Sequence, residues 1–150
     1  MNKLASKQMY ELAGLPTPPY MVLKQGDRID PVDCEERFGL PLVVKPLEAG
    51  SSVGMTIVKS ASEIEAAAQK AFKHGDTILM ENFVEGIEIM AGVVGNRTLE
   101  SLPIIEIIPG EGYAFFDYEA KYTPGATREI CPARISDAMT EKAQTYAKMA

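Results

Sequence analysis

The hydrophobic positions along the chain follow a helical period in some stretches and form short apolar runs in others. The clearest helical period is in Ile64–Phe72, where apolar residues recur at i, i+3, i+4, i+7 and i+8. Just before it, Ser60 and Glu63 predict a capping box. Further helices are predicted over residues 1–13, with Asn2 as the cap, over 31–38, and from Ser136 to the end. Strands are predicted over residues 20–23, 42–44, 55–58, 77–83, 87–94, 97–99 and 102–108.

The order of these elements predicts an α+β fold. Several strands follow one another closely, and Gly95-Asn96 is a favourable turn for a β-hairpin. Hairpins combined with helices on one side are typical of an α+β architecture rather than of a doubly wound parallel sheet. With 150 residues, of which 46% are hydrophobic, the chain is long enough for one compact unit or two small lobes.

The regular pattern is lost between residues 109 and 128, which we expect to form a long loop. A loop of this length in a compact domain is usually functional or disordered. Its aromatic residues argue against disorder, because such side chains favour a covered position; they are Tyr113, Phe115, Phe116, Tyr118 and Tyr122. We therefore expect a loop that folds over a site, with packing against the body of the protein as the alternative.

The stretch from Val43 to Met55 carries the most informative polar residues. An apolar run delivers one lysine, Lys45, and is followed by a loop that contains two glycines and two serines, Gly50-Ser51-Ser52-Val53-Gly54. A lysine is rarely buried without a partner, because an ammonium loses several kcal/mol of hydration. The loop can help to hold an anion, since glycines allow close approach and successive amides form an anion-binding nest. The combination predicts a phosphate site.

The residues alone leave other interpretations open. Lys45 also fits an edge position beside an ordinary hairpin turn, because Gly and Ser are common in loops. On the first helix, Lys3 and Lys7 fit solvated lysines. His74, the only histidine, follows the helix that ends near Phe72 and fits an interaction with the helix C terminus better than a catalytic role.

Composition excludes several classes of protein. The formal net charge of −6 argues against a nucleic-acid partner, which requires a basic face. Cys34 and Cys131 are too few and too distant for a metal motif or a disulfide framework, which favours two reduced thiols in a cytoplasmic protein. No apolar run approaches the length of a membrane span and the start resembles no signal peptide, so no membrane partner is expected.

Four separated motifs in this order resemble the D-alanine–D-alanine ligases of the ATP-grasp superfamily. They are Val-Val-Lys-Pro at 43–46, Gly-Ser-Ser-Val-Gly-Met at 50–55, Glu-x-Phe-Val-x-Gly-x-Glu at 81–88, and Asp-Tyr-Glu-Ala-Lys-Tyr at 117–122. The resemblance covers nearly the whole chain. It implies an ATP-grasp fold and, for the full enzyme, an ATP-dependent ligase of peptidoglycan synthesis.

The resemblance implies that ATP is the cofactor and assigns residues to its phosphates. Lys3 and Lys45 resemble the lysines that contact the phosphates. Ser51 and Ser52 resemble the loop serines that lie over the phosphates and the substrate, and Ser51 is thereby also a candidate catalytic residue.

The remaining assignments come from the third and fourth motifs. By the same resemblance, Glu81 and the backbone near Val84 would hold adenine, and Glu88 would bind the ribose hydroxyls. Lys121 and Tyr122, the other candidate catalytic residues, would close on the γ-phosphate and on the D-alanine that donates the acyl group. Carboxylates suit the amine and hydroxyl donors, and lysines suit the charge of phosphoryl transfer.

In such ligases ATP phosphorylates the carboxylate of one D-alanine, and the amine of a second D-alanine attacks the acylphosphate. Magnesium bridges the phosphates. No metal ligands are recognised in these residues, so the resemblance places the magnesium ligands outside this chain, after Ala150. It also allows a homodimer of the full enzyme.

The resemblance further implies that residues 1–84 form the small nucleotide-binding lobe and residues 85–150 the beginning of a truncated large lobe. The remaining domains, including an N-terminal one before Met1, would be partners of this chain, and the chain alone is expected to be inactive. Two alternatives stay open. Another ATP-grasp carboxylate–amine ligase shares the lysine strand and the Gly-Ser loop, although Tyr122 after Lys121 argues against it. A non-catalytic nucleotide-binding module is favoured by the missing metal ligands.

Overall fold

The computed structural model describes residues 2–150, which group into two compact units. Of these residues, unit 1 consists of 2–8 and 17–85, and unit 2 of 9–16 and 86–150. Residues 9–16 therefore group with unit 2, whereas the predicted division at residue 84 kept them in the first lobe. The assignment of the two parts as ATP-grasp lobes stays a prediction.

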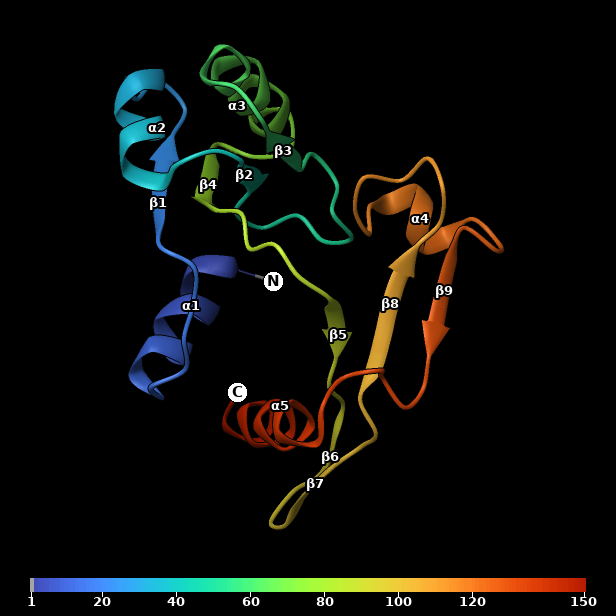
Figure 1. Cartoon of the computed structure of the whole chain (residues 1–150). Helices are drawn as coiled ribbons and strands as arrows, with labels where there is room; N and C mark the ends of the chain where they lie inside the picture. The colour runs from blue at the N-terminus through green and yellow to red at the C-terminus, as the bar shows by residue number, and fades with distance from the viewer. Residues whose placement is uncertain (1) are drawn as a thin grey trace. The chain divides into compact units, whose positions relative to one another are not determined.

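Unit 1 is built on a four-stranded antiparallel sheet with the order β1-β4-β2-β3 (Figure 1). Its strands are β1 (Tyr20–Lys24), β2 (Leu42–Pro46), β3 (Thr56–Val58) and β4 (Thr77–Asn82), and its helices are α1 (Lys3–Leu12), which continues into unit 2, α2 (Pro31–Phe38), the 3₁₀ turn η1 (Ala61–Glu63) and α3 (Ile64–Phe72). The predicted helices over 1–13, 31–38 and 64–72 are confirmed apart from Met1, which lies outside the described residues.

One face of this sheet carries the hydrophobic core. Alternate residues of β2 and β4, including Leu42, Val44, Ile78 and Met80, are fully buried in one cluster. Cys34 and Phe38 of α2 belong to the cluster, as do Ile64, Ala67, Ala68 and Ala71 of α3. The apolar face of α3 thus packs against the apolar face of the strands. The small alanines let the helix lie close to the sheet.

The predicted capping box before α3 is wrong in its detail. The Ser60 hydroxyl makes no cap hydrogen bond and lies 3.0 Å from the hydroxyl of Ser62. Glu63 accepts from the backbone N–H of Lys59 at 2.9 Å instead, because the 3₁₀ turn η1 moves the helix start to Ile64. The other predicted caps are confirmed, with Asn2 accepting from the N–H of Ala5 and Ser136 from that of Met139.

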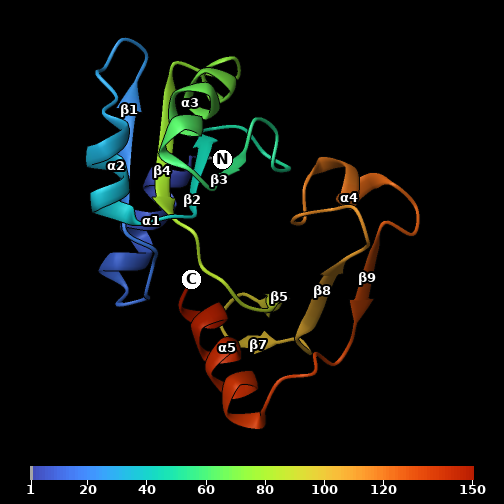
Figure 2. The ribbon, with the colours of Figure 1, turned by 45° about the horizontal axis from the view of Figure 1, so that its top comes forward.

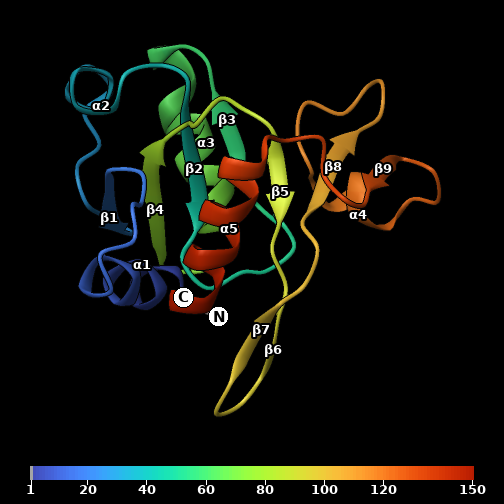
Figure 3. The ribbon, with the colours of Figure 1, turned by 60° about the horizontal axis from the view of Figure 1, so that its bottom comes forward.

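Unit 2 contains a three-stranded antiparallel sheet, β5-β8-β9, and a separate two-stranded hairpin, β6-β7. Figure 2 shows β8 and β9 side by side with α4 at one end of them, and Figure 3 shows the extended β6-β7 hairpin. The elements are β5 (Glu88–Met90), β6 (Val93–Gly95), β7 (Leu99–Ser101), β8 (Ile105–Pro109), α4 (Tyr118–Tyr122), β9 (Thr127–Ile130) and α5 (Asp137–Met149).

Two expectations for unit 2 need correction. The single strand predicted over residues 87–94 is two strands, β5 and β6, and Gly92 between them lies against Leu102, where an added Cβ would come within 3.2 Å of its side chain. The stretch 109–128 is not free of regular structure. Asp117 caps α4 by accepting from the N–H of Ala120 at 2.8 Å, and the buried Ala120 accepts from the Thr127 hydroxyl at 2.7 Å.

An ion pair between the buried Glu106 and the exposed Arg134 holds the connection between β9 and α5 against β8. The Glu106 carboxylate, in β8, receives two guanidinium hydrogen bonds from Arg134, at 2.7 Å and 3.0 Å, and a third from the backbone N–H of Arg134 at 3.1 Å. Glu106 is 4% exposed. These hydrogen bonds from Arg134 lower the pKa of Glu106 to about 2. The sequence analysis did not anticipate this pair, because it links positions 28 residues apart.

We predict that Glu106→Gln destabilises the protein near neutral pH and has a smaller effect in acid. The folded-state pKa of Glu106 lies below the value of about 4.3 for an unfolded glutamate. Its ionisation therefore stabilises the fold above that pH, and this contribution is lost as the pH falls towards 2. Urea unfolding midpoints at neutral pH and at about pH 3 measure the effect.

Glu129→Gln, at an exposed position of β9, is the matched control and should leave the midpoint nearly unchanged at both pH values. An equal loss of stability for Glu106→Gln at both pH values would show that the stabilisation does not come from the negative charge of Glu106.

Candidate functional site

The face of the unit 1 sheet opposite the hydrophobic core is polar where β1, β4 and β2 meet. Glu81 of β4 lies opposite Tyr20 of β1 and Val43 of β2 in the register of the sheet. Residues directly opposite one another point to the same face, and Lys45 follows Val43 by two positions. The register therefore places Glu81, Tyr20 and Lys45 on one face, so that a long lysine side chain reaches the carboxylate diagonally.

Two lysines hold Glu81, one on each carboxylate oxygen. Lys45 Nζ donates to Oε1, and Lys7 Nζ lies 2.7 Å from Oε2. The side chains of Lys7 and Glu81 are each 9% exposed and that of Lys45 is 20% exposed. The interpretation of Lys45 as an edge residue does not describe this geometry, because Lys45 lies on an interior strand and has a carboxylate partner.

The expectation that Lys7 is solvated is wrong. Its ammonium also donates to the carbonyl of Pro18 at 3.0 Å and lies 4.7 Å from the centre of the Tyr20 ring. Sequence reasoning missed this residue. A usable signal was its spacing of four from Lys3, which puts both lysines on the same face of α1.

Lys3 is also partly buried, at the start of α1. Its ammonium donates to three backbone carbonyls, those of Pro46 at 2.7 Å, Leu47 at 3.3 Å and Ala49 at 2.5 Å. Burial lowers the pKa of Lys3, and the positive charge of Lys45 lowers it further, while Glu81 acts in the opposite direction. Lys3 thus anchors the start of the Gly-Ser loop to α1, and the expectation of a merely solvated lysine is wrong here too.

The charges of this cluster do not balance. Lys3, Lys7 and Lys45 bring three ammonium groups; Lys7 and Lys45 contact the Glu81 carboxylate, and Lys3 contacts backbone carbonyls. Their partial burial strengthens the repulsion between like charges relative to water. The arrangement therefore favours an anionic ligand next to Lys3 and Lys45, whereas Lys7 is directed at protein partners.

The loop after β2 has an unusual backbone. Ser51 and Ser52 both adopt positive φ angles, of 50° and 58°. The N–H of Val53 donates to the carbonyl of Gly50 at 3.1 Å, and the N–H of Met55 donates to that of Ser52 at 3.2 Å, which closes two successive turns. Positive φ is unfavourable for a residue with a side chain and is concentrated at binding sites, where the surrounding structure maintains it.

Gly54 lies at the end of this loop, at a position that has no room for a side chain. Its φ is +72°, and an added Cβ would come within 2.6 Å of His74 Cδ2 and 2.9 Å of Pro46 Cγ. His74 therefore packs against the loop from the end of α3. This contact is a role that the sequence analysis did not foresee for the single histidine.

Val84 and Glu88 follow β4 along the chain. Val84 is 67% exposed directly after the strand. Glu88 opens β5 in unit 2, where desolvation raises the pKa of its carboxyl group and the positive charge of Lys121 opposes that shift. Lys121 and Glu88 are therefore close enough to interact within unit 2.

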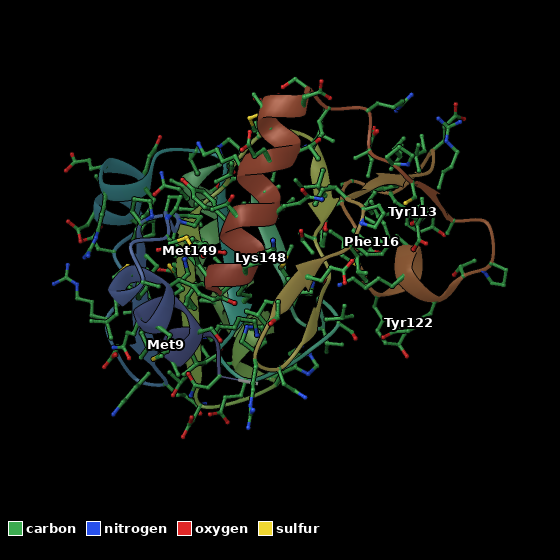
Figure 4. All side chains as sticks on the ribbon, turned by 90° about the horizontal axis from the view of Figure 1, so that it is seen from below. Met9, Tyr113, Phe116, Tyr122, Lys148 and Met149 are labelled. Carbon is green, nitrogen blue, oxygen red and sulfur yellow. The ribbon has the colours of Figure 1, made fainter. Side chains whose placement is uncertain are left out.

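Lys121 and Tyr122 lie on α4. The Lys121 ammonium is 5.0 Å from the centre of the Phe116 ring, and the rings of Tyr118 and Tyr122 are 4.8 Å apart. Figure 4 shows Phe116, Tyr113 and Tyr122 in the same part of unit 2. Tyr118 and Tyr122 thus contact one another on α4 and remain exposed, so the expectation of covered aromatic side chains does not hold for these two.

The predicted site residues fall into two groups. Lys3, Lys45, Ser51, Ser52, Glu81 and Val84 belong to unit 1, and Glu88, Lys121 and Tyr122 belong to unit 2. Contacts join Lys45 to Glu81, and an electrostatic interaction joins Glu88 to Lys121. The functional roles of all nine residues stay predictions.

Residues 2–150 contain no group of three or more His, Cys, Asp or Glu side chains that could hold a metal ion. The assignment of the magnesium ligands to residues outside this chain stays a prediction. Over the same residues no helix has both the length and the apolar character of a membrane span. Cys34 is a buried free thiol and Cys131 an exposed one.

Comparison with known sequences identifies one family. The family model described as "D-ala D-ala ligase C-terminus" matches residues 9–150. The D-alanine–D-alanine ligase of Syntrophobacter fumaroxidans is 54% identical over 153 residues, which cover 100% of this chain and 48% of that protein. The ligase of Desulfotalea psychrophila is 44% identical and covers 98% of this chain and 46% of its own length. The chain thus spans about half the length of the curated relatives it matches.

Solved structures share the fold. The VanG D-Ala:D-Ser ligase from Enterococcus faecalis is 31% identical with a TM-score of 0.79, over 99% of this chain and 43% of that one. D-alanyl-alanine synthetase A from Vibrio cholerae is 29% identical with a TM-score of 0.80, over 99% of this chain and 46% of that one. These matches confirm the predicted α+β, ATP-grasp fold and the resemblance to D-alanine ligases.

We predict that Gly54→Ala destabilises the protein by about 1–3 kcal/mol, because the added Cβ overlaps His74 and Pro46 at a positive φ. Gly50→Ala is the matched control in the same loop, since no atom lies within 4 Å of the added Cβ and φ is not positive. Its free energy of unfolding should change by less than about 0.5 kcal/mol. Urea unfolding measures both, and equal values for the two variants would contradict the close packing of Gly54.

Proposed function

Because this chain belongs to the D-alanine–D-alanine ligase family, we propose that it forms the ATP-binding part of such a ligase. The observation that carries the proposal is the surplus of partly buried ammonium groups beside a loop in which two serines have positive φ angles. The positive charge of Lys3 and Lys45 next to such a loop suits a polyphosphate.

In this proposal Lys3 and Lys45 bind the phosphates of ATP. Ser51 and Ser52 lie over the phosphates and the substrate, and the positive φ angles of both serines support this role. The lysines contribute electrostatic stabilisation, since phosphoryl transfer depends mainly on positioning and on charge placed around the phosphates.

The remaining residues serve the nucleoside and the closure of the site. Glu81 and the backbone near Val84 hold adenine, and Glu88 binds the ribose hydroxyls. Lys121 and Tyr122 on α4 approach the γ-phosphate and the acyl-donor D-alanine, and the segment 109–128 acts as a lid that excludes water from a reactive acylphosphate. The contacts of Lys121 with Phe116 and of Tyr118 with Tyr122 support a segment that is ordered around α4.

For the complete ligase we propose formation of D-alanyl-D-alanine in the cytoplasm, where ATP is available. The first D-alanine gains a phosphoryl group on its carboxylate, and the amine of the second displaces phosphate. Magnesium, held by residues outside this chain, would neutralise phosphate charge. D-alanine as the second substrate is supported by the similarity to D-alanine–D-alanine ligases, whereas the Enterococcus faecalis structure is that of a D-Ala:D-Ser ligase.

We predict that the 150-residue chain binds ATP and that Lys45→Met weakens this binding by about 2 kcal/mol, roughly 30-fold, because a charge-assisted contact is lost. Isothermal titration calorimetry with ATP measures the change. Lys59→Met, at an exposed position after β3, is the control and should bind like the unmodified chain.

Two results would contradict the proposal. The folded chain could fail to bind ATP at millimolar concentration, which would favour a role outside nucleotide binding. Alternatively, Lys45→Met and Lys59→Met could bind ATP equally well, which would remove Lys45 from the phosphate site.

A further inference from the structure

We propose that Lys7 is a positioning residue of the nucleotide site. It neutralises Glu81 from the protein side and thereby leaves the charge of Lys45 available to a phosphate. The inference rests on the proposed function and adds a residue to which that function gives no role.

Lys7 contacts three groups of unit 1. Its ammonium meets the Glu81 carboxylate at 2.7 Å, the Pro18 carbonyl at 3.0 Å and the Tyr20 ring at 4.7 Å. Lys7 is 7% exposed. The low exposure of Lys7 and these contacts direct its ammonium at Glu81 and at the protein around it.

Glu81 divides its two oxygens between two lysines. Oε2 meets Lys7 and Oε1 meets Lys45, and both contacts lie on the polar face of the sheet. The three groups together carry one net positive charge. Without Lys7, Lys45 would be the lysine left in contact with Glu81, and this pair would be neutral.

The loss of this net positive charge would weaken phosphate binding, because the site is partly buried. Charges at low exposure interact more strongly than charges in water, so a neutralised Lys45 attracts a phosphate less. A carboxylate without Lys7 would also repel the phosphates of a bound nucleotide. Lys7 therefore acts on phosphate affinity through Glu81 and Lys45, without touching the ligand.

A purely structural role for Lys7 predicts a different outcome. The ion pair also joins α1 to β4, and its loss could loosen the whole of unit 1. Such a defect would weaken the binding of adenosine and of ATP alike. The charge effect acts only on the phosphates and is reversed when the charge of Glu81 is also removed.

The experiment measures ATP and adenosine affinities by NMR titration of the 150-residue chain, as the unmodified protein and as Lys7→Met, Glu81→Gln and the double variant. The quantity compared is the ratio of ATP affinity to adenosine affinity within each protein, which cancels any effect of Glu81→Gln on adenine. We expect Lys7→Met to lower this ratio about tenfold and the double variant to restore it to within about threefold of the unmodified protein. Lys7→Arg, which retains the charge, should keep the ratio.

Three results would overturn the inference. They are an unchanged ratio in Lys7→Met, a ratio that the double variant does not restore, and a ratio that falls equally in Lys7→Arg. If Lys7→Met does not fold, the double variant decides, and a ratio lowered more than about threefold counts against the proposal. A folded, unmodified chain that binds neither ligand would instead reject the proposed function, and the role of Lys7 with it.

Discussion

The Glu81 carboxylate is the point on which the polar side of unit 1 depends. It joins the side chains of three elements, because Lys7 comes from α1, Lys45 from β2 and Glu81 itself from β4. Removing one partner from a buried ion pair costs about 3–5 kcal/mol, since the remaining charge is left without compensation. The position of α1 on the sheet is thus coupled to the charges of the candidate site.

The two faces of the same sheet have different physical functions. On one face, the alternate residues of β2 and β4 pack against α2 and α3 without polar groups in the core cluster, which provides hydrophobic stabilisation. On the other face, the strands present Lys45 and Glu81 at low exposure. A rigid apolar layer beneath them fixes the strand register, and the register in turn fixes which lysine meets which carboxylate oxygen.

Much of this fold could be predicted from local patterns. The period of Ile64–Phe72, the Asn2 and Ser136 caps and the alternation in the strands all depend on neighbours within a few residues. What the sequence did not reveal depends on distant partners. Lys7 is paired with a residue 74 positions away, and Glu106 with one 28 positions away, so neither pair leaves a local pattern. The Gly-Ser loop was found because its composition is local, whereas the contact of Gly54 with His74 is not.

The strained loop and the excess of lysines both indicate an anion-binding site. Each serine at positive φ costs of order 1–3 kcal/mol, and such strain persists only where surrounding contacts impose it. Here Lys3 fixes the entrance of the loop through the Ala49 carbonyl, and Gly54, packed on His74, fixes its exit. Because both ends are anchored, the backbone of the loop is restricted before a ligand arrives. In the proposed function, this preorganisation would reduce the entropy that is lost when a phosphate binds between Lys3 and Lys45.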